Sequence, residues 1–433
     1  MVKRETIALL PLTFHAVDKC VHCTLANMMI SFPSYLCAML KDKIKRLASQ
    51  YGPDLIKIRH HLHANPELSY KEFETSKLVQ QQLDVLGIPY TIKATTGVIG
   101  LLKGKNPDKR VIALRADMDA LPIAEENDVP YKSKNDGIMH ACGHDVHTTC
   151  LLGAARILNE LKEEWEGTIK LIFQPGEEKN PGGASLLIKE GALENPRPSA
   201  ILGLHVHPQL EIGKFRFRGG KIMASADEIY ITIKSKGGHA AAPQETADTI
   251  LIASQLIVAL QQIVSRNRNP FSPSVLSITS FHGGYTTNVI PSEVKLMGTF
   301  RAMDEAWRFK AHDLIRKLST ELVHSMGAEI DLLIDVGYPT VYNNEQLNSI
   351  TEASAAAYAG AENVEESELR MGAEDFGYYS QVIPGCFYRL GAGNISKGIT
   401  SGVHTPTFNI DEDAIPLGAG MMAWLGATVD MEI

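Results

Sequence analysis

Residue types that bind divalent metal ions follow several apolar runs of this 433-residue chain. They are Cys142 and His144 in HACGHD, Glu177 and Glu178 in FQPGEE, His205 in GLHVHP, and His404 in GVHTPTFNIDED. A thiolate, three imidazoles and a carboxylate could together hold two divalent ions, with one glutamate left free to move a proton. The combination indicates metal-assisted hydrolysis.

The adjacent glutamates predict a division of labour. Glu177 and Glu178 follow the apolar run LIF and a Pro-Gly turn, and neighbouring side chains point in different directions. A metal-activated water with a pKa near ~7 needs a base to take its proton and pass it to the leaving group. We therefore assign Glu177 as the base and Glu178 as the ligand; a solvated loop is the ordinary alternative.

Cys142 and His144 are two residues apart. On an extended segment both side chains would face one way, toward a metal. For an isolated pair, a buried cysteine and a helix-capping histidine would be the commoner interpretation. Ligand types at neighbouring strand ends favour the metal.

Other histidines and acids accompany these ligands. His205 and His207 are alternatives for one position; His205 is nearer the expected strand end, and His207, before Pro208, is expected at the surface. His140 and His147 could orient ligands. The carboxylates expected to brace ligand side chains, with a plain surface acid as the alternative for each, are Asp117, Asp119, Asp145 and Glu374.

A second group of polar residues lies farther along the chain. His239 follows two glycines after a predicted strand, and Asn288 precedes the strand that carries Arg301. Together they could grip a substrate carboxylate and polarise its carbonyl. A surface histidine and an ion-paired arginine are equally compatible with the spacing.

Alternating helices and apolar strands must position these residues. Helices are expected at 53–65, 72–86, 146–161 and 183–190, and strands at 98–103, 110–115, 168–173, 200–205 and 386–390. The pattern predicts an α/β fold with a mixed sheet and helices on both faces. Ligands collect beyond the carboxyl ends of strands in such sheets.

A smaller domain is expected inside the larger one. Residues 228–335 show the order strand, helix, strand, strand, helix, strand, which predicts a ferredoxin-like βαββαβ lid. The expected division is an extension without catalytic role at 1–43, catalytic segments at 44–218 and 337–433, and a lid at 219–336.

Bulk properties argue against several function classes. The net charge is −8 and there is no Lys/Arg-rich block, so nucleic-acid and anionic-membrane partners are not expected. We also expect no apolar stretch approaching the ~20 residues of a membrane span. Three of the six cysteines lie in the first 40 residues and the other three are scattered, which favours a reducing, cytoplasmic compartment, although residues 1–43 could carry a targeting segment. No phosphate-binding glycine motif supports a nucleotide site.

The motifs resemble the hippurate hydrolase, N-acyl-amino-acid amidohydrolase and auxin-conjugate hydrolase group of dinuclear metallopeptidases. The similar segments run from about residue 57 to 413: IRHHLHANPELS, ALRADMDALPI, MHACGHDVH, IFQPGEE, GLHV, SKGGHAAAP, NVIP, GTFR, GAEDF and VHTPTFNIDE. The resemblance implies metal ligands at Cys142, His144, Glu178, His205 and His404, with Glu177 as acid and base. It also implies substrate contacts from His239, Asn288 and Arg301.

The same resemblance implies two divalent ions per subunit and a homodimer through the lid, in which the lid histidine reaches a partner's site. Relatives suggest Mn²⁺, whereas the Cys142 thiolate favours Zn²⁺. The expected reaction is hydrolysis of the amide of an N-acyl-amino acid. Alternatives are a carboxypeptidase or dipeptidase, an N-acetyldiaminopimelate deacetylase, or an inactive metal-binding interaction protein.

Overall fold

The structure is a computed structural model that describes the backbone of residues 22–431 and the side chains of residues 38–431. The chain divides into two compact units between Lys43 and Ile44. Residues 22–43, the described part of the first unit, are helical, although the sequence before residue 40 shows no helical periodicity.

The first helix is much longer than the sequence pattern predicts. α1 (His22–Ala64) contains Pro53, which the pattern places at the helix start. Within the second unit, Leu47, Tyr51 and Leu55 are buried at intervals of four residues. This burial outweighs the hydrogen bond that a proline removes from a helix interior.

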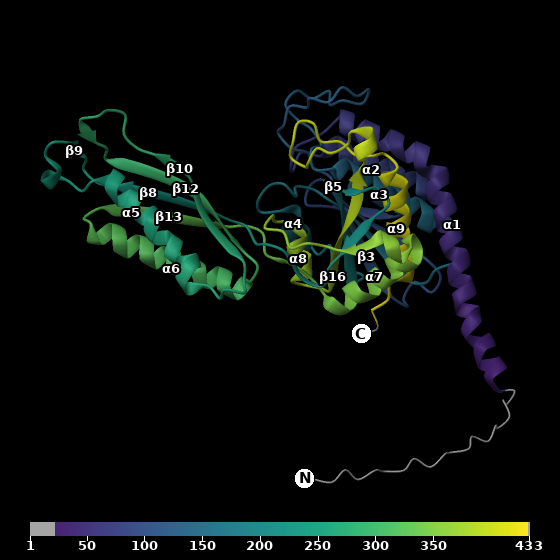
Figure 1. Ribbon diagram of the computed structural model, residues 1–433. Helices are drawn as coiled ribbons and strands as arrows, with labels where there is room; N and C mark the ends of the chain where they lie inside the picture. Colours follow the sequence, from purple (N-terminus) through teal and green to yellow (C-terminus); the bar gives the residue numbers. More distant parts are fainter. Residues whose placement is uncertain (1–21, 432–433) are drawn as a thin grey trace, which may run out of the picture. The chain divides into compact units, whose positions relative to one another are not determined.

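An eight-stranded mixed sheet forms the catalytic domain, with the order β1-β2-β4-β3-β5-β16-β6-β15 (Figure 1). Its strands are β1 (Tyr90–Lys93), β2 (Gly97–Lys103), β3 (Val111–Asp117), β4 (Thr168–Gln174), β5 (Ala200–Glu211), β6 (Phe215–Phe217), β15 (Val364–Glu366) and β16 (Gly385–Gly393). β4, β3, β5 and β16 are parallel neighbours at its centre. The predicted mixed α/β sheet is confirmed.

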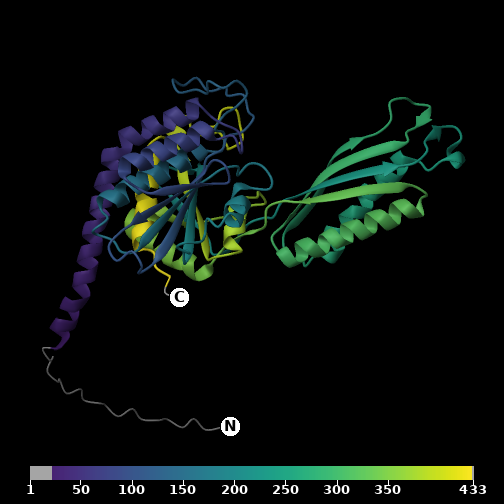
Figure 2. The same cartoon turned by 180° about the vertical axis from the view of Figure 1, so that it is seen from behind.

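Helices cover both faces of this sheet. One face is covered by α2 (Phe73–Leu86), α3 (His144–Glu160), α7 (Glu345–Ala359) and α9 (Ala414–Thr428). Figure 2 shows the same molecule from behind. α4 (Gly183–Lys189) and α8 (Phe376–Ser380) pack on the other, where Leu187, Phe376 and Phe387 share one apolar core. The central strands are therefore buried on both sides, and a site can form at their carboxyl ends.

The lid has the predicted element order. It consists of β8 (Asp227–Lys234), α5 (Thr249–Gln262), β10 (Ser274–His282), β12 (Glu293–Ala302), α6 (Glu305–Ser325) and β13 (Glu329–Val336). Its antiparallel sheet has the order β10-β12-β8-β13, and Ile231, Leu256 and Ile315 belong to the core that joins the sheet to its two helices. The separate small domain is confirmed, while the exact residue boundaries between domains stay predictions.

The two chain crossings into the lid lie side by side, because β7 (Gly220–Met223) pairs antiparallel with β14 (Val341–Asn343). The sequence pattern does not predict these two short strands. β9 (Gly238–His239) and β11 (Val289–Ile290) form another small pair beyond the end of β8.

One helix corrects the expectation about apolar length. Thr249–Asn267, which is α5 with the π-helical turn η2 (Ile263–Asn267), is long and apolar enough to cross a membrane by length and composition. Its Ile252, Leu256 and Leu260 are buried in the lid core. Since core helices meet the same criterion, this helix is weak evidence for a membrane span.

Candidate active site

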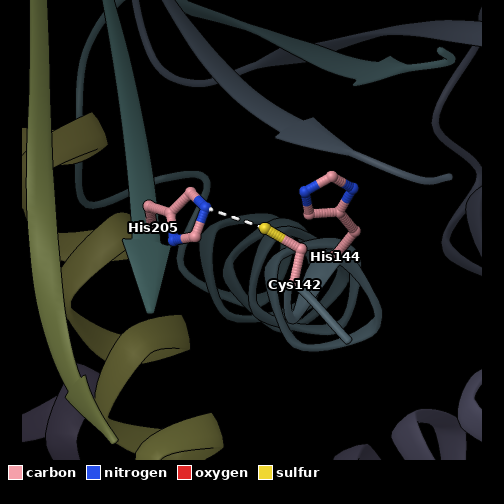
Figure 3. Close-up of side chains that lie close together, drawn as sticks. All are labelled: Cys142, His144 and His205. Atoms are coloured by element: carbon pink, nitrogen blue, oxygen red, sulfur yellow. Dashed lines mark hydrogen bonds between the residues drawn. The ribbon is translucent and has the colours of Figure 1, made fainter. Parts of the chain in front are cut away.

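Cys142 and His144 meet through a turn and not along an extended segment, which corrects the prediction. Gly143 has a φ of 91°, and α3 begins directly at His144. A Cβ atom at Gly143 would lie 2.4 Å from Cγ2 of Val206, so a glycine is needed where α3 starts beside β5. Figure 3 shows the two side chains at the start of this helix.

His205 lies within β5 and not at its end, because the strand continues to Glu211 beside β16. β3 pairs with β5 only as far as Gly203, so the sheet still opens beside His205. Its Nδ1 lies 2.7 Å from the carbonyl oxygen of Val206, and its Nε2 lies 3.4 Å from Sγ of Cys142 (Figure 3). The bond at Nδ1 orients Nε2 toward the thiol.

Glu178 and His404 complete one side of the group. Oε1 of Glu178 lies 3.3 Å from Nε2 of His404. His404 has a φ of 61°, which is uncommon outside glycine, and its N–H donates to the carbonyl of Ala141. Backbone strain of this kind clusters at functional sites.

The residues present fit a pair of divalent ions. Ligand atoms lie close enough together to share an ion in several groups, among them Cys142 with His144 and His205, and Cys142 with Glu178 and His404. Nε2 of His144 and Oε1 of Glu178 are buried and have no hydrogen-bond partner among the described residues. Buried polar atoms are rarely left unpaired, so these two atoms indicate a place for a cation.

The mutual charges of the ligands shift their pKa values strongly. Burial and the charges of Glu178 and Glu177 raise the pKa of Cys142 well above its usual range. Burial lowers the pKa of His144, but Asp117 and Asp119 outweigh it and raise that pKa to about 10. A cation among these groups would favour the deprotonated thiolate and the neutral imidazole.

Glu177 is buried, with 6% of its surface exposed. Burial and the neighbouring Glu374 and Glu178 raise the pKa of its carboxyl well above the usual value. Its Oε2 lies 4.0 Å from Nε2 of His144. A raised pKa helps a carboxyl to hold a proton that it has taken up, as acid and base catalysis requires.

Asp119 supports the backbone that carries both glutamates. It accepts hydrogen bonds from the N–H groups of Glu177 and Glu178 and from Oγ of Ser69, and its Oδ1 lies 3.2 Å from Nδ1 of His144. These contacts fix the glutamates relative to His144.

Asp117 orients a different histidine. Its Oδ1 lies 2.6 Å from Nδ1 of His147, whose Nε2 accepts from the N–H of Val206. Both ring nitrogens of His147 are therefore in use, and its ring packs against that of His205.

The other two carboxylates expected to brace ligands differ from each other. Glu374 accepts from Nη2 of Arg115 at 2.9 Å and lies near Glu177. Asp145 instead bonds to Arg59 and His63 and to none of the candidate ligands in the described part of the chain. The prediction for Asp145 rests on its nearness to His144 in sequence, but neighbouring residues of a helix point to different surroundings.

Residues that the sequence pattern does not single out stabilise this network. Arg115 is fully buried and bonds Asp117, Glu374 and Asp375. Tyr338 donates to the carbonyl of Glu177. Arg115 and Asp375 stand inside the motifs RADMD and GAEDF, which is the signal that could have found them, whereas Tyr338 has none.

The candidate ligands Cys142, Glu178, His205 and His404 line a cavity of about 780 Å³ together with Glu177. Arg301 lines this cavity too.

Two predicted substrate-binding residues lie elsewhere. His239 and Asn288 are exposed and are not among the residues that line the cavity. His239 pairs with Val289 between β9 and β11, and Asn288 directly precedes β11.

His207 lines the cavity, so the prediction that it lies at the surface is wrong. Its Nδ1 lies 3.0 Å from Nη1 of Arg370. The physical reason is the length of β5, which carries His207 past His205 on a strand that stays paired with β16.

Known proteins resemble the chain over nearly its whole length. Thermostable carboxypeptidase 2 of Saccharolobus solfataricus is 41% identical over 385 residues, which cover 88% of this chain and 96% of that protein. IAA-amino acid hydrolase ILR1-like 5 of Arabidopsis thaliana is 39% identical over 420 residues, covering 96% of this chain and 94% of that protein.

A solved structure shares the fold. A dinuclear metal-binding peptidase of the M20 family from Bacillus subtilis matches with a TM-score of 0.76 and 34% identity, over 88% of this chain and 99% of that one. The model of peptidase family M20/M25/M40 matches residues 113–425. The chain therefore belongs to peptidase family M20/M25/M40 and is a hydrolase of carbon–nitrogen bonds.

Proposed function

We propose that the chain hydrolyses the amide bond of N-acyl-amino acids and releases a carboxylic acid and a free amino acid. The observation that carries this proposal is the meeting of ligand side chains around a buried glutamate, with unpaired atoms on His144 and Glu178. The two relatives are named as a carboxypeptidase and as a hydrolase of IAA-amino acids, and an amide to an amino-acid nitrogen fits both names.

In this proposal the ions are held by Cys142, His144, Glu178, His205 and His404. When bound, two divalent ions supply a water of lowered pKa and polarise the scissile carbonyl. The Cys142 thiolate favours Zn²⁺ over Mn²⁺ as the native ion, because soft ligands select borderline-soft metals.

Glu177 moves the proton. It takes a proton from the attacking water and later donates that proton to the nitrogen of the departing amino acid. Its burial beside Glu374 keeps the proton available, and the Tyr338 hydroxyl holds the Glu177 backbone in place.

Arg301 binds the carboxylate of the amino acid. It lines the cavity, and its Nε donates to Oγ1 of Thr299, which leaves the terminal N–H groups of the guanidinium for a ligand. Arginine can hold a carboxylate through two parallel hydrogen bonds.

His239 and Asn288 serve the cavity of a second copy, where His239 stabilises the developing oxyanion. Asp227, at the start of β8, lines the cavity, whereas His239 follows the far end of that strand. A strand of this length spans roughly 25 Å at about 3.3 Å per residue, so His239 cannot reach back without movement of the whole lid. β10 is an edge strand with Val275 and Phe281 exposed, which offers a surface for pairing with a second lid.

Mixed dimers test this assignment. Glu177→Gln and His239→Ala proteins should each be inactive. Random exchange of subunits should then restore about a quarter of wild-type activity, since half of the dimers would contain one intact site. A mixture that stays inactive, although its dimers exchange subunits, would place His239 outside the partner's site.

A substrate panel tests the reaction itself. Metal-stripped protein would be given Zn²⁺ or Mn²⁺ and assayed for amino acid release from N-acyl-amino acids, dipeptides and N-acetyldiaminopimelate. Metal-dependent release from N-acyl-amino acids is expected. Faster turnover of dipeptides would identify a peptidase, and no release with metal bound would contradict the proposal.

A further inference from the structure

Two arginines in the active-site cavity have no acidic partner. Arg389 and Arg370 both line the cavity that contains the candidate metal ligands. Neither forms an ion pair with a carboxylate in the part of the chain that the structure describes. Arg301 in the same cavity is unpaired as well, but the proposed reaction already gives it a substrate carboxylate.

Arg389 is directed toward the metal ligands by its strand. It is the partner of His205 in the parallel register of β16 and β5, so both side chains project from the same face of the sheet. Only 6% of Arg389 is exposed. Among the residues whose side chains the structure describes, the only hydrogen-bond acceptor that its guanidinium reaches is Sδ of Met223, at 2.9 Å, and a thioether is a weak acceptor.

Arg370 lies beside it on the segment that leads to the GAEDF motif. A backbone bridge joins Arg370 to Met223, the residue that contacts Arg389. Its Nη1 donates to Nδ1 of His207 at 3.0 Å. A ring nitrogen that accepts this bond carries no proton, so His207 offers Arg370 a hydrogen bond but no negative charge.

Other buried arginines of the described chain are compensated. Arg59 pairs with Asp145, Arg115 with three carboxylates, and Arg308 with Asp227. Of the carboxylates, Glu374 has the largest favourable electrostatic effect on Arg389, but Glu374 is already bonded to Arg115. Buried charge is unfavourable unless it is paired, and metal ions nearby would only add positive charge. The missing partner must therefore be an anion that comes with a ligand.

We propose that Arg389 and Arg370 form a second anion subsite, which binds a carboxylate of the substrate other than the one held by Arg301. His207 positions Arg370 by accepting its hydrogen bond. The inference rests on the proposed function and narrows its substrate class to N-acyl-amino acids with a second carboxylate. That carboxylate stands either on the acyl chain or on the amino-acid side chain.

Matched substrate pairs test this inference and separate the two sources. N-succinyl-L-alanine and N-butanoyl-L-alanine differ by a carboxylate on the acyl side, and N-acetyl-L-glutamate and N-acetyl-L-glutamine differ on the side chain. In the pair whose extra carboxylate reaches the subsite, wild-type kcat/KM should be at least about tenfold higher for the dianionic member. The member without that carboxylate, called the neutral member below, cannot form the charge-assisted hydrogen bonds to the arginines.

Two variants and a control assign the preference. In Arg370→Gln and in Arg389→Gln the preference should shrink to less than about threefold, because kcat/KM for the dianionic member should fall more than kcat/KM for the neutral member. Arg370 is only half-buried, so its variant serves if Arg389→Gln does not fold. Arg197→Gln, which removes an exposed ion pair with Glu194, should keep the full preference.

A binding measurement makes the outcome independent of turnover. Calorimetry on metal-free protein should show tighter binding of the dianionic member of the preferred pair by wild type than by Arg370→Gln. Equal turnover of both members of both pairs would overturn the subsite and leave the proposed function intact. The same holds for a preference that survives in both variants, or for an equal loss on all substrates. If no substrate is turned over at all, the proposed function fails, and calorimetry alone decides on the subsite.

Discussion

The catalytic cavity and the lid present their polar residues in opposite ways. At the catalytic site both Asp119 and Glu177 are buried. Asp119 accepts backbone hydrogen bonds, and Glu177 lies beside other carboxylates. On the lid, His239 and Asn288 are exposed and bond mainly to their own loops, His239 to Ala241 and Asn288 to Thr286. The cavity is therefore preorganised for chemistry within one chain, whereas the lid residues depend on movement or assembly.

A second contrast lies at the base of the lid. Asp227 is buried and bonds both Arg308 and His312. These contacts join β8 to α6 close to the two chain crossings. The lid thus has a rigid base and an exposed tip, and loss of a residue at each place should have different consequences.

Metal removal should have the largest effect, and only on the cavity. Chelation should abolish turnover, and added Zn²⁺ or Mn²⁺ should restore it, because the ions supply the reactive water. The lid core contains no candidate ligand among the described residues, so the lid should stay folded. The contribution of its helices to the far-ultraviolet circular dichroism of the protein should therefore change little. Full turnover in the presence of chelator, with less than one metal ion bound per chain, would contradict the claim that catalysis in the cavity needs bound ions.

Replacing Asp227 should destabilise the protein by about 3–5 kcal/mol at neutral pH, because Arg308 would lose its buried partner. Asp227→Asn would be compared with wild type by urea denaturation. Glu228→Gln is the control and should change little, because Glu228 is an exposed neighbour whose carboxylate accepts a hydrogen bond from the Tyr230 hydroxyl.

The same pair of proteins tests a pH dependence. Burial raises the pKa of Asp227, but hydrogen bonds from His312 and Arg308 outweigh burial and hold that pKa below its usual value of 3.8. The stabilisation should be fully present above pH 3.8 and should be lost as the pH falls through the lower, folded-state pKa. A stability difference that is constant down to the acid unfolding transition would contradict this assignment.

Asp119→Asn should lower turnover or metal affinity by about 10- to 100-fold, because the variant cannot accept all the bonds that position Glu177, Glu178 and His144. Metal titration and kcat should change together. Asp145→Asn, whose bonds go to Arg59 and His63, should affect stability more than metal affinity. A larger loss of metal affinity in Asp145→Asn than in Asp119→Asn would contradict the different roles assigned to these two carboxylates.

The smallest effect is expected at a helix cap of the lid. Asp248 accepts hydrogen bonds from the N–H groups of Ile250 and Leu251 at the start of α5. Asp248→Ala should cost about 1 kcal/mol of stability. Thermal unfolding should shift slightly, and turnover at 25 °C should not. A large loss of turnover would show that the lid is more tightly coupled to the cavity than its exposed tip indicates.

The sequence predicts the cavity better than the details of its walls. Glu177 and Glu178 could be placed because they follow an apolar strand closely, and strand ends meet in an α/β sheet. Cys142 and His404 could be placed because their motifs carry metal-ligand residue types. His207 could not, because the length of β5 depends on its pairing with β16. The arginines also escape prediction, since only the folded chain shows that Arg115 is paired and Arg389 is not.

The lid shows the same limit at another scale. Its βαββαβ order follows from alternating apolar patterns that need no knowledge of distant contacts. The pairing of β7 with β14 joins segments more than a hundred residues apart, and strands of four and three residues carry too little pattern to be recognised.

The central claim is that Glu177 moves the proton in a site whose ions are held by other residues. The most direct test measures metal content and amino acid release in parallel for wild type and Glu177→Gln. Release should fall by about 10²- to 10⁴-fold in the variant while both proteins bind the same amount of Zn²⁺ or Mn²⁺. Near-normal turnover in the variant would contradict the role of Glu177, and a loss of turnover that only follows a loss of metal would make Glu177 a ligand and not the base.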